Sequence, residues 1–535
     1  MTGAVLAPSG SRAGANPWVI AAIVVVPTFM EVLDTTIALV ALRYIAGGLS
    51  TSVVDGEWVI TSYLAANAII LPITGWLSAH LGRRNYFLMS IAVFTLASGL
   101  CGMATSLGQL ILFRVVQGLA GGGLQPSSQG VLLDAFPPER QGVAMTLFGL
   151  AALLAPVVGP TLGGWITDSY SWRWVFLINV PIGLLAFAAC YIALRDPDYL
   201  TAERAELRSR PFSIDSIGLS LLVIVIVCWE VALSKGQEWD WFGDPFWRVQ
   251  TLAILFAVGL IGLIIWELRH PNPVVNFRPL GERNFAACCI IIFCAYAVLY
   301  GASTSLPALL QALFGYDALN AGLVMSPSGF FAVLTMPVVG ILLGRRIDAR
   351  WLIACGLLVM TIGNYWMSQL NLSISPGQVV WPRVVLIVGI SLCFAPVNVA
   401  AYLYTPLALR GAAVGLLSLL RNEGGSVGTS MAQTVQERRL QFHTLRLGEY
   451  LDPFDPALKS FLNQARALFV QQTHDPVAVQ QLGWQVLENL RQQQASALAY
   501  FDVFWLSAVV TLVLAPLVLL MKRSVAEKGA RVSAE

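Results

Sequence analysis

The sequence EVLDTTIALVAL, residues 31–42, lies in an apolar stretch that begins near Trp18, and this stretch decides the class of fold. A helix that crosses a lipid bilayer needs roughly 20 mostly apolar residues, and the stretch is long enough to supply them. Yet Glu31 and Asp34 are three positions apart, so a helix places both carboxyl groups on one side. Because ionised groups are costly in hydrocarbon, that side is expected to face a cavity or the interior of a helix bundle.

The composition of the whole chain supports a membrane protein. Of 535 residues, 57% are hydrophobic and 12% are charged, about half the charged fraction of an average soluble domain. A scan for spans predicts an all-α integral membrane protein with fourteen transmembrane helices. They are expected near residues 17–40, 58–79, 86–104, 109–132, 142–166, 174–194, 215–234, 248–268, 285–310, 320–344, 351–370, 379–403, 411–434 and 500–521.

Basic residues in the loops predict the orientation. If the N-terminus is cytoplasmic, nineteen of the 32 Lys and Arg residues fall in inner segments and four in short outer loops. An excess of basic residues in short loops marks the cytoplasmic side of a membrane. We therefore expect both termini to be cytoplasmic.

The helices divide into groups of six, two and six. A first six-helix bundle is expected in residues 1–195, linkers and two extra helices in 196–284, and a second six-helix bundle in 285–535. The sequences GWLSAHLGRRN (75–85) and GILLGRRIDAR (340–350) both follow the second helix of a bundle, which indicates a weak internal repeat. Repeated halves are a common architecture of secondary transporters.

One outer loop, from about residue 436 to 499, is long. Its Gln-rich part carries Val477, Leu482, Val486 and Leu490 at helical spacing, which predicts an amphipathic helix outside the membrane. This segment is expected either to cap the bundle or to dock a partner.

Two apolar stretches carry unusual residues. LILFRVVQG, residues 110–118, places Arg114 and Gln117 on one helical face, and an Arg at membrane depth is expected to face a cavity or a partner. APVVGPTLGG, residues 155–164, combines small residues at a spacing that allows close helix contact with prolines that remove backbone hydrogen bonds.

Taken in order, these stretches resemble signatures of the major facilitator superfamily, specifically its fourteen-helix drug:proton antiporters. LDTTIALVAL resembles the first-helix signature, GWLSAHLGRR the loop after helix two, LILFRVVQG the fourth-helix motif and GPTLGG the antiporter motif. WRWVFLINVPIG (172–183) and RNEGGSVGTS (421–430) are similar to helices six and thirteen. The resemblance implies a conformational role for Gly75, Gly82, Arg83, Arg84, Pro156, Gly159, Pro160, Gly163 and Gly164.

The long outer loop further resembles the EmrB-type branch of Gram-negative bacteria. That resemblance implies a multi-pass protein of the bacterial inner membrane that pairs with a periplasmic EmrA-type membrane-fusion adaptor and a TolC-like outer-membrane channel. It also implies hydrophobic substrates and a cycle driven by the proton-motive force without a cofactor.

The chain departs from the family pattern at several positions. Ala79 and His80 occupy the places where the loop motif usually has Asp and Arg, and Ala155 replaces a glycine of the antiporter motif. Glu31 stands where related sequences more often have an uncharged polar residue. These departures weaken the expected charge relay of the loop and make Glu31 a feature of this chain.

The two acids of the first helix are predicted to couple transport to protons. Two like charges in one low-dielectric cavity are not both ionised cheaply, so we expect Glu31 and Asp34 to titrate as a coupled pair. The resemblance makes Asp34 the essential acid and places Arg114 close enough to compete with its proton. For Glu31, direct proton handling and a simpler role as a substrate-binding charge both remain open.

Polar and aromatic residues in other spans are candidates for the substrate cavity. Aromatic and amide side chains among apolar walls suit a large hydrophobic substrate. The candidates are Asn67, Gln117, Gln125, Gln129, Tyr296, Tyr300, Asn398 and Tyr402, with Arg421 and Glu423 as charges of the second bundle.

Other functions are less well supported by the sequence. No HExxH zinc motif or GxxxxGK[ST] nucleotide loop is present, the basic residues form no nucleic-acid-binding cluster, and no cysteine spacing predicts a metal site. The protein is therefore predicted to be a transporter and not an enzyme. A dedicated exporter of one amphipathic compound, such as a fatty acid or a siderophore, is the main alternative to a multidrug pump, and a membrane enzyme or scaffold is the more distant one.

Overall fold

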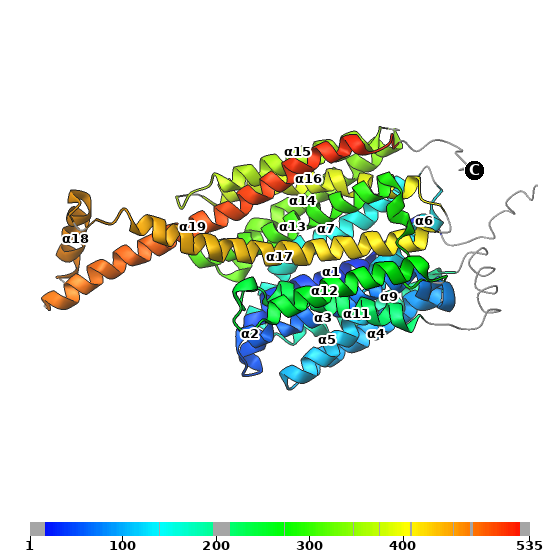
Figure 1. Ribbon diagram of the computed structural model, residues 1–535, viewed down its shortest axis with the longest axis horizontal. Coiled ribbons are helices and arrows are strands. Elements are labelled where there is room, and N and C mark those ends of the chain that lie inside the picture. The colour runs from blue at the N-terminus through cyan, green and yellow to red at the C-terminus, as the bar shows by residue number, and fades with distance from the viewer. Residues whose placement is uncertain are drawn as a thin grey trace, which may run out of the picture.

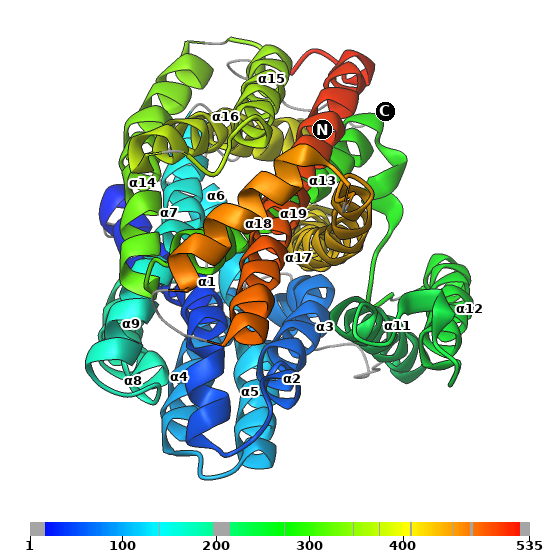
Figure 2. The same cartoon turned by 90° about the vertical axis from the view of Figure 1, so that its left-hand side faces the viewer.

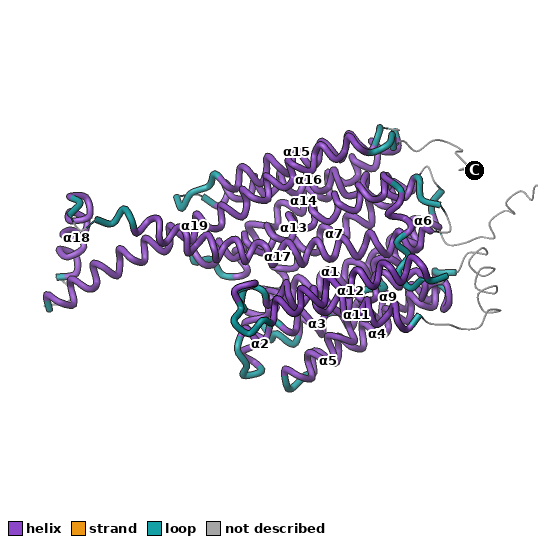
Figure 3. The backbone as a smooth tube through the Cα atoms, viewed as in Figure 1, coloured by secondary structure: helices purple, strands orange, loops and turns teal. Residues whose placement is uncertain are grey.

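The computed structural model describes residues 16–137, 140–195, 215–271, 273–345, 347–373, 375–406, 409–452, 454–470 and 475–524. Within these ranges every regular element is a helix (Figure 3). The charged segment 196–214 predicted between the sixth and seventh spans lies outside the described residues, as do several basic residues used to predict the orientation, such as Arg12 and Lys528.

Helices of the first half form one group. They are α1 (Pro17–Gly48), the short α2 (Val53–Gly56), α3 (Trp58–Leu81), α4 (Arg83–Met103), α5 (Leu107–Gly121), α6 (Leu124–Ala135), α7 (Gln141–Ser169), α8 (Trp174–Leu177) and α9 (Asn179–Ala193). Helix α1 begins where Asn16 accepts a hydrogen bond from the backbone N–H of Trp18 at 3.0 Å and Pro17 occupies the first turn. This capping satisfies a donor that the helix itself leaves free.

Helices of the second half form the other group. They are α13 (Arg283–Phe314), α14 (Ala318–Gly344), α15 (Ala349–Ser368), α16 (Pro376–Leu403), α17 (Arg410–Gly448), α18 (Pro456–Phe469) and α19 (Pro476–Leu514). Figure 1 shows the two groups side by side with their long axes nearly parallel. We call the end of the molecule near Asn16 and Ser524 the terminal end, and the opposite end the α18 end.

Two additional helices, α11 (Ser216–Lys235) and α12 (Arg248–Arg269), stand to one side. Figure 2 shows α11 beside α3 and α17, with α12 outermost. In the turn that joins them, Arg248 Nε donates a 3.0 Å hydrogen bond to Asp244, and this interaction lowers the pKa of Asp244 to about 2. The turn is therefore held by an ion pair at neutral pH.

Twelve helical segments of the described chain are long and apolar enough to cross a membrane. Helix α7 passes the same test if its halves Val143–Pro156 and Val158–Ser169, bent by 40°, count as one span. Helix α17, predicted as a span over 411–434, is not among them, because its glycines and serines and the charged Arg421 and Glu423 lower its hydropathy. Length and composition thus support a multi-helix membrane fold without fixing the number fourteen.

The segment predicted as a long outer loop is mostly helical. Helix α17 continues to Gly448, α18 follows, and α19 runs from Pro476 into the helix predicted as the last span (Figure 1). The amphipathic helix predicted in the Gln-rich part is therefore present, but as an unbroken extension of the last span.

Small residues allow the central helices to approach closely. A Cβ atom at Gly159 of α7 would meet the hydroxyl of Thr36 in α1, and one at Gly163 would lie 3.1 Å from Ile37 Cγ2. Thr36 Oγ1 already donates to Leu33 O at 3.0 Å, so this hydroxyl sits in a fixed position. The glycines at these two positions therefore serve the contact between α1 and α7.

We predict that Gly159→Ala destabilises the protein, because the added methyl group forces α1 and α7 apart. Overpacking of this kind costs about 1–3 kcal/mol. Thermal unfolding in detergent should show a lower Tm. Gly47→Ala is the matched control, since a Cβ at Gly47 meets nothing within 4 Å. Equal Tm values for the two variants would contradict this account of the contact.

Candidate functional site

Asp34 lies in a closed network of hydrogen bonds. Arg114 Nη1 donates to its Oδ2 at 2.5 Å, while Gln117 Nε2 and Asn179 Nδ2 donate to its Oδ1 at 3.0 and 2.7 Å. The side chains of both Asp34 and Arg114 are 0% exposed. A charged pair in this position is fully removed from solvent, and its hydrogen bonds replace those of water.

Arg114 is fixed by contacts beyond the carboxylate. Its Nε donates to the backbone carbonyl of Val59 at 3.0 Å, and its guanidinium carbon lies 4.0 Å from the centroid of the Tyr63 ring. Its Nη2 has no hydrogen-bond partner among the described residues. The network therefore joins α1, α3, α5 and α9 around one ion pair.

Glu31 has a separate set of partners. Gln125 Nε2 donates to its Oε2 at 2.6 Å, and Asn67 Nδ2 and the Tyr63 hydroxyl donate to its Oε1 at 3.0 and 3.3 Å. Its partners are neutral donors, in contrast to the cation that holds Asp34. Glu31 is only 4% exposed, yet it lines a cavity.

The prediction that both acids face one cavity is wrong for Asp34, because only Glu31 lines the cavity. Positions three apart on a helix differ by about 60° in direction, which is enough here to give each carboxyl group its own neighbours. Glu31 borders the cavity, whereas Asp34 is not part of its lining. Tyr63 lies between them, since its hydroxyl donates to Glu31 and its ring covers Arg114.

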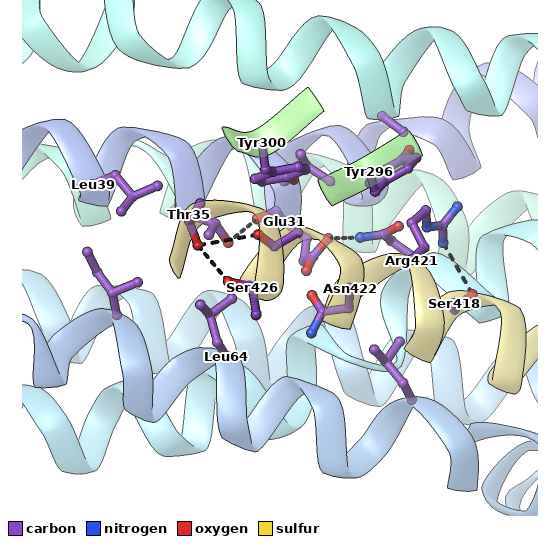
Figure 4. Close-up of a pocket in the computed structure, with 17 residues that line it drawn as sticks. Glu31, Thr35, Leu39, Leu64, Tyr296, Tyr300, Ser418, Arg421, Asn422 and Ser426 are labelled. Carbon is purple, nitrogen blue, oxygen red and sulfur yellow. Dashed lines mark hydrogen bonds between the residues drawn. The ribbon is translucent and has the colours of Figure 1, made fainter. Parts of the chain in front are cut away.

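The cavity lies between the two helix groups and measures about 780 Å³, part of it continuous with solvent. Figure 4 shows Glu31 and Thr35 opposite Tyr296, Tyr300 and Arg421. Its lining is Glu31, Val32, Thr35, Leu39, Ile60, Leu64, Leu71, Gln125, Ala152, Tyr296, Tyr300, Ser418, Arg421, Asn422, Gly425, Ser426 and Thr429. This mixture of apolar walls and a few polar groups suits an amphipathic ligand.

Arg421 places a positive charge on the wall opposite Glu31. Its guanidinium lies 5.4, 5.8 and 5.9 Å from the ring centroids of Phe148, Tyr296 and Phe394, and Nη2 donates to Ser418 Oγ at 3.2 Å. Among the described residues it has no salt bridge within 4.0 Å. The cavity thus presents one acid from the first half and one base from the second.

Three of the residues predicted for the substrate cavity close it instead. Gln129 Nε2 donates to Asn398 Oδ1 at 2.9 Å, and the Tyr402 hydroxyl donates to Gln129 Oε1 at 3.4 Å. These bonds connect the two halves near the terminal end, where a Cβ at Gly75 would also lie 3.1 Å from the backbone of Gly411. From this closure the cavity extends toward the α18 end, where its lining includes Leu39, Ile60 and Thr429.

The remaining predictions divide in the same manner. Gln125, Tyr296 and Tyr300 line the cavity, whereas Asn67 and Gln117 are buried behind it and hold the two acids. Glu423 does not line the cavity either and lies next to Glu230 of α11. Some side chains predicted to contact the substrate thus hold the carboxyl groups of Glu31 and Asp34 in place instead.

The motif residues at the terminal end form a second polar site. Gly82 has φ 88°, a conformation that favours glycine, at the turn between α3 and α4. Arg83 forms an ion pair with Asp134 and donates to Gly130 O at 3.1 Å, and Arg84 donates to Leu194 O and Tyr191 O at 2.8 Å each. Although Ala79 and His80 replace the usual charges, a charged contact between α4 and α6 is present.

The other motif residues shape α7. Pro156 lies at the bend between the two halves of this helix, and Pro160 lies in the half that follows. The backbone carbonyl of Gly164 accepts a 3.1 Å hydrogen bond from Thr167 Oγ1.

Sequence reasoning missed two residues of the Asp34 network. Asn179 and Tyr63 are buried polar side chains in apolar helices, and buried polar groups in such a setting need partners. That signal was available for Asn179, which lies in the quoted segment WRWVFLINVPIG. The partner itself depends on the packing of α9 against α1, which no local pattern specifies.

Enzyme and metal chemistry find little support in the geometry. The sequence GGSVG, residues 424–428, has the GxSxG spacing of a hydrolase nucleophile, but it lies inside helix α17 and not at the strand-to-helix turn that such a site requires. Within the described ranges no group of three or more His, Cys, Asp or Glu residues is placed to hold a metal ion.

Comparison with known proteins gives a family match. The model of the Major Facilitator Superfamily matches residues 24–429. The chain is 38% identical to the multidrug export protein EmrB of Haemophilus influenzae, over 90% of this chain and 91% of that protein. It is 36% identical to EmrB of Escherichia coli K12, over 92% of each chain, and 35% identical to the fatty acid resistance protein FarB of Neisseria gonorrhoeae, over 92% and 94%. Among solved structures, the human organic anion transporter MFSD10 has the same fold, with a TM-score of 0.55, 14% identity and coverage of 94% of this chain and 99% of that one.

We predict that Arg114→Gln is strongly destabilising, because it leaves the Asp34 carboxylate buried without a cation. Breaking a buried pair from one side costs about 3–5 kcal/mol. The double variant Asp34→Asn/Arg114→Gln should recover much of the lost stability, since no charge then remains. Tm and the yield of monodisperse protein measure both. Arg446→Gln, which breaks an exposed pair with Glu449, is the control; a double variant as unstable as Arg114→Gln would refute the explanation.

Proposed function

Because the chain belongs to the major facilitator superfamily, we propose that it is a proton-coupled multidrug efflux antiporter that exports hydrophobic or amphipathic compounds. The names of its EmrB relatives support multidrug export. The observation that carries the proton coupling is the fully buried Asp34–Arg114 pair, which lies directly behind the cavity wall formed by Glu31. Such a carboxylate can exchange its cation partner for a proton.

In this proposal the protein spans the bacterial inner membrane fourteen times. Helix α17 is the span that composition alone does not identify, and its length of 39 residues and its packing against α13, α3 and α19 support a transmembrane position. The excess of basic residues in the loops of the terminal end supports a cytoplasmic location for that end. The α18 end then projects into the periplasm.

With the terminal end in the cytoplasm, the proposal assigns this structure to an outward-facing conformation. Gln129, Asn398 and Tyr402 close the cytoplasmic side, and the cavity extends toward the periplasm. A proton arriving from the periplasm neutralises Asp34 and weakens its bond to Arg114, while a substrate leaves the cavity. Return to the inward-facing state carries the proton across, and a potential of 100 mV contributes about 2.3 kcal/mol for each charge moved.

The periplasmic extension is the proposed docking surface for an EmrA-type membrane-fusion adaptor, which would connect the protein to a TolC-like outer-membrane channel. Helix α18 and the neighbouring parts of α17 and α19 expose large apolar side chains there. Leu445, Tyr450, Phe454, Leu468 and Val477 are each more than 60% exposed. Several large apolar side chains exposed in one part of the chain support a protein partner there.

A dedicated exporter of one amphipathic compound is the second candidate. Arg421 favours it, because an Arg at the cavity wall suits the carboxylate of a fatty acid, and one relative is named a fatty acid resistance protein. Efflux and resistance measured over a panel of compounds in a deletion strain distinguish the two, since a dedicated exporter protects against a single chemical class.

We predict that Asp34→Asn abolishes proton-driven efflux. Because the change leaves Arg114 buried without its anion, a lower Tm is expected as well, and efflux is measured on the monodisperse fraction. The amide keeps the shape of the carboxyl group but has no proton to release. Transport by this fraction in reconstituted vesicles with an imposed pH gradient should fall at least tenfold, and the double variant Asp34→Asn/Arg114→Gln, which carries no unpaired charge, should show the same loss. Asp502→Asn, outside the cavity and the Asp34 network, serves as the control. Unimpaired efflux by Asp34→Asn would rule out the assigned role.

We also predict opposite substrate preferences for the two charges of the cavity. Glu31→Gln should weaken export of ethidium, a cation, by about tenfold, which corresponds to 1.4 kcal/mol, and should leave export of a long-chain fatty acid nearly unchanged. Arg421→Gln should do the reverse. Export rates in whole cells measure both. If both variants lose both substrates equally, these side chains do not select substrate charge.

A further inference from the structure

Two acidic side chains meet at the contact between the accessory helix α11 and α17. Glu230 is 2% exposed and Glu423 is 6% exposed, and their carboxyl groups interact directly. Glu230 Oε1 and both carboxyl oxygens of Glu423 have no hydrogen-bond partner within the described part of the chain. Two carboxylates offer only acceptors to each other, so the contact between them lacks a donor unless one of them carries a proton.

The charged groups around this pair do not compensate it. On α11, Lys235 lies five positions nearer the α18 end and donates to Glu57, the residue before α3, and to Glu238 at 3.2 and 2.7 Å. On α17, Arg421 turns to the aromatic wall of the cavity. From α12, Glu267 belongs to the opposite end of the hairpin, near Asp215.

The groups that act on the two carboxyls are neutral. They are Trp229 on α11 and Asn422 and Ser426 on α17. Asn422 Nδ2 and Ser426 Oγ have no hydrogen-bond partner of their own in the described chain. The pair therefore lies in a buried environment without a nearby cation, in which two ionised carboxylates would repel each other strongly.

The pair lies close to the transport cavity. Asn422 and Ser426 line the cavity and also neighbour the two acids, so one layer of side chains separates the pair from it. At 1.5 Å per residue, Glu31, Glu230 and Glu423 are each about 20 Å from the start of their helices. The acid pair and Glu31 therefore share a similar depth.

Helix α11 contacts both halves of the protein. Toward α3 its Ser234 hydroxyl lies 2.5 Å from that of Thr61. Toward α17 its Leu233 carbonyl accepts from Ser430 Oγ at 2.7 Å, and Gln237 in the following turn donates to Glu437 at 2.8 Å. A change at the α11–α17 contact therefore acts where α3 and α17 border the cavity.

We propose that Glu230 and Glu423 form a second proton-binding site, separate from Asp34 and built between the accessory helix and the second half of the protein. A proton on one carboxyl group supplies the missing donor and links α11 to α17 by an O–H···O hydrogen bond. Loss of that proton leaves two like charges facing each other and weakens the contact. The inference deepens the proposed proton coupling and rests on it for its role in transport.

Infrared spectroscopy of the purified protein in lipid vesicles at pH 7 tests the site without a substrate. The carbonyl stretch of a protonated carboxyl group is separate from the bands of an ionised one. Compared with the native protein, Glu230→Gln/Glu423→Gln should lose the intensity of about one protonated carboxyl group per molecule. Glu488→Gln, which removes an exposed carboxylate paired with Arg491, should lose none.

An unchanged band in the double variant would overturn the proposal. If the double variant does not give monodisperse protein, the single variants carry the test, since Gln keeps the volume of Glu; the band should fall in at least one of them, and its persistence in both would be equally decisive. The readout is independent of efflux by Asp34→Asn. Failure of the proposed transport function and failure of this proton site are therefore distinguishable.

Discussion

The buried pair of Asp34 and Arg114 is the interaction on which the first half of the protein depends. A lipid bilayer offers no water to solvate either charge, so every hydrogen bond of the pair has to come from neighbouring helices. α5 supplies Arg114 and Gln117, α9 supplies Asn179, and α3 supplies the carbonyl of Val59. The packing of four helices is thereby tied to one ionisation state of one carboxyl group. A proton on that group changes the energy of the whole arrangement, which is the physical requirement for coupling protonation to movement.

Glu31 and Asp34 have different surroundings, which suit the two different roles proposed for them. A carboxyl group held by an Arg is stable but closed to a substrate, whereas Glu31, held by the neutral donors Gln125 and Asn67, reaches the cavity. Tyr63 touches both sets, because its hydroxyl bonds Glu31 and its ring covers Arg114.

Hydropathy predicted most of the helices, because a helix that crosses a membrane requires a long apolar run that can be recognised in the local sequence. The span predicted over 411–434 forms the first part of α17, whose mean hydropathy is lowered by Arg421, Glu423 and its glycines and serines. The roles of individual polar residues were harder to predict. Gln117 was expected in the cavity but holds Asp34, and Gln129, Asn398 and Tyr402 join the two halves. A polar residue in an apolar helix signals that a partner exists, but the partner lies far away in sequence and is chosen by packing.

The contacts that close the terminal end are weaker than those inside the first half, and this difference indicates how the molecule can move. The closure at the terminal end depends on neutral hydrogen bonds such as Gln129 to Asn398, each of which contributes only about 0.5–1.5 kcal/mol net. Glycines at 75 and 411 let the backbones meet there without interlocking side chains. Separating the ion pair inside the first half costs more, because it leaves two buried charges unpaired. Movement that separates the halves at their closed end while keeping each half intact therefore has the lowest cost, which is the kind of movement that the proposed transport cycle requires.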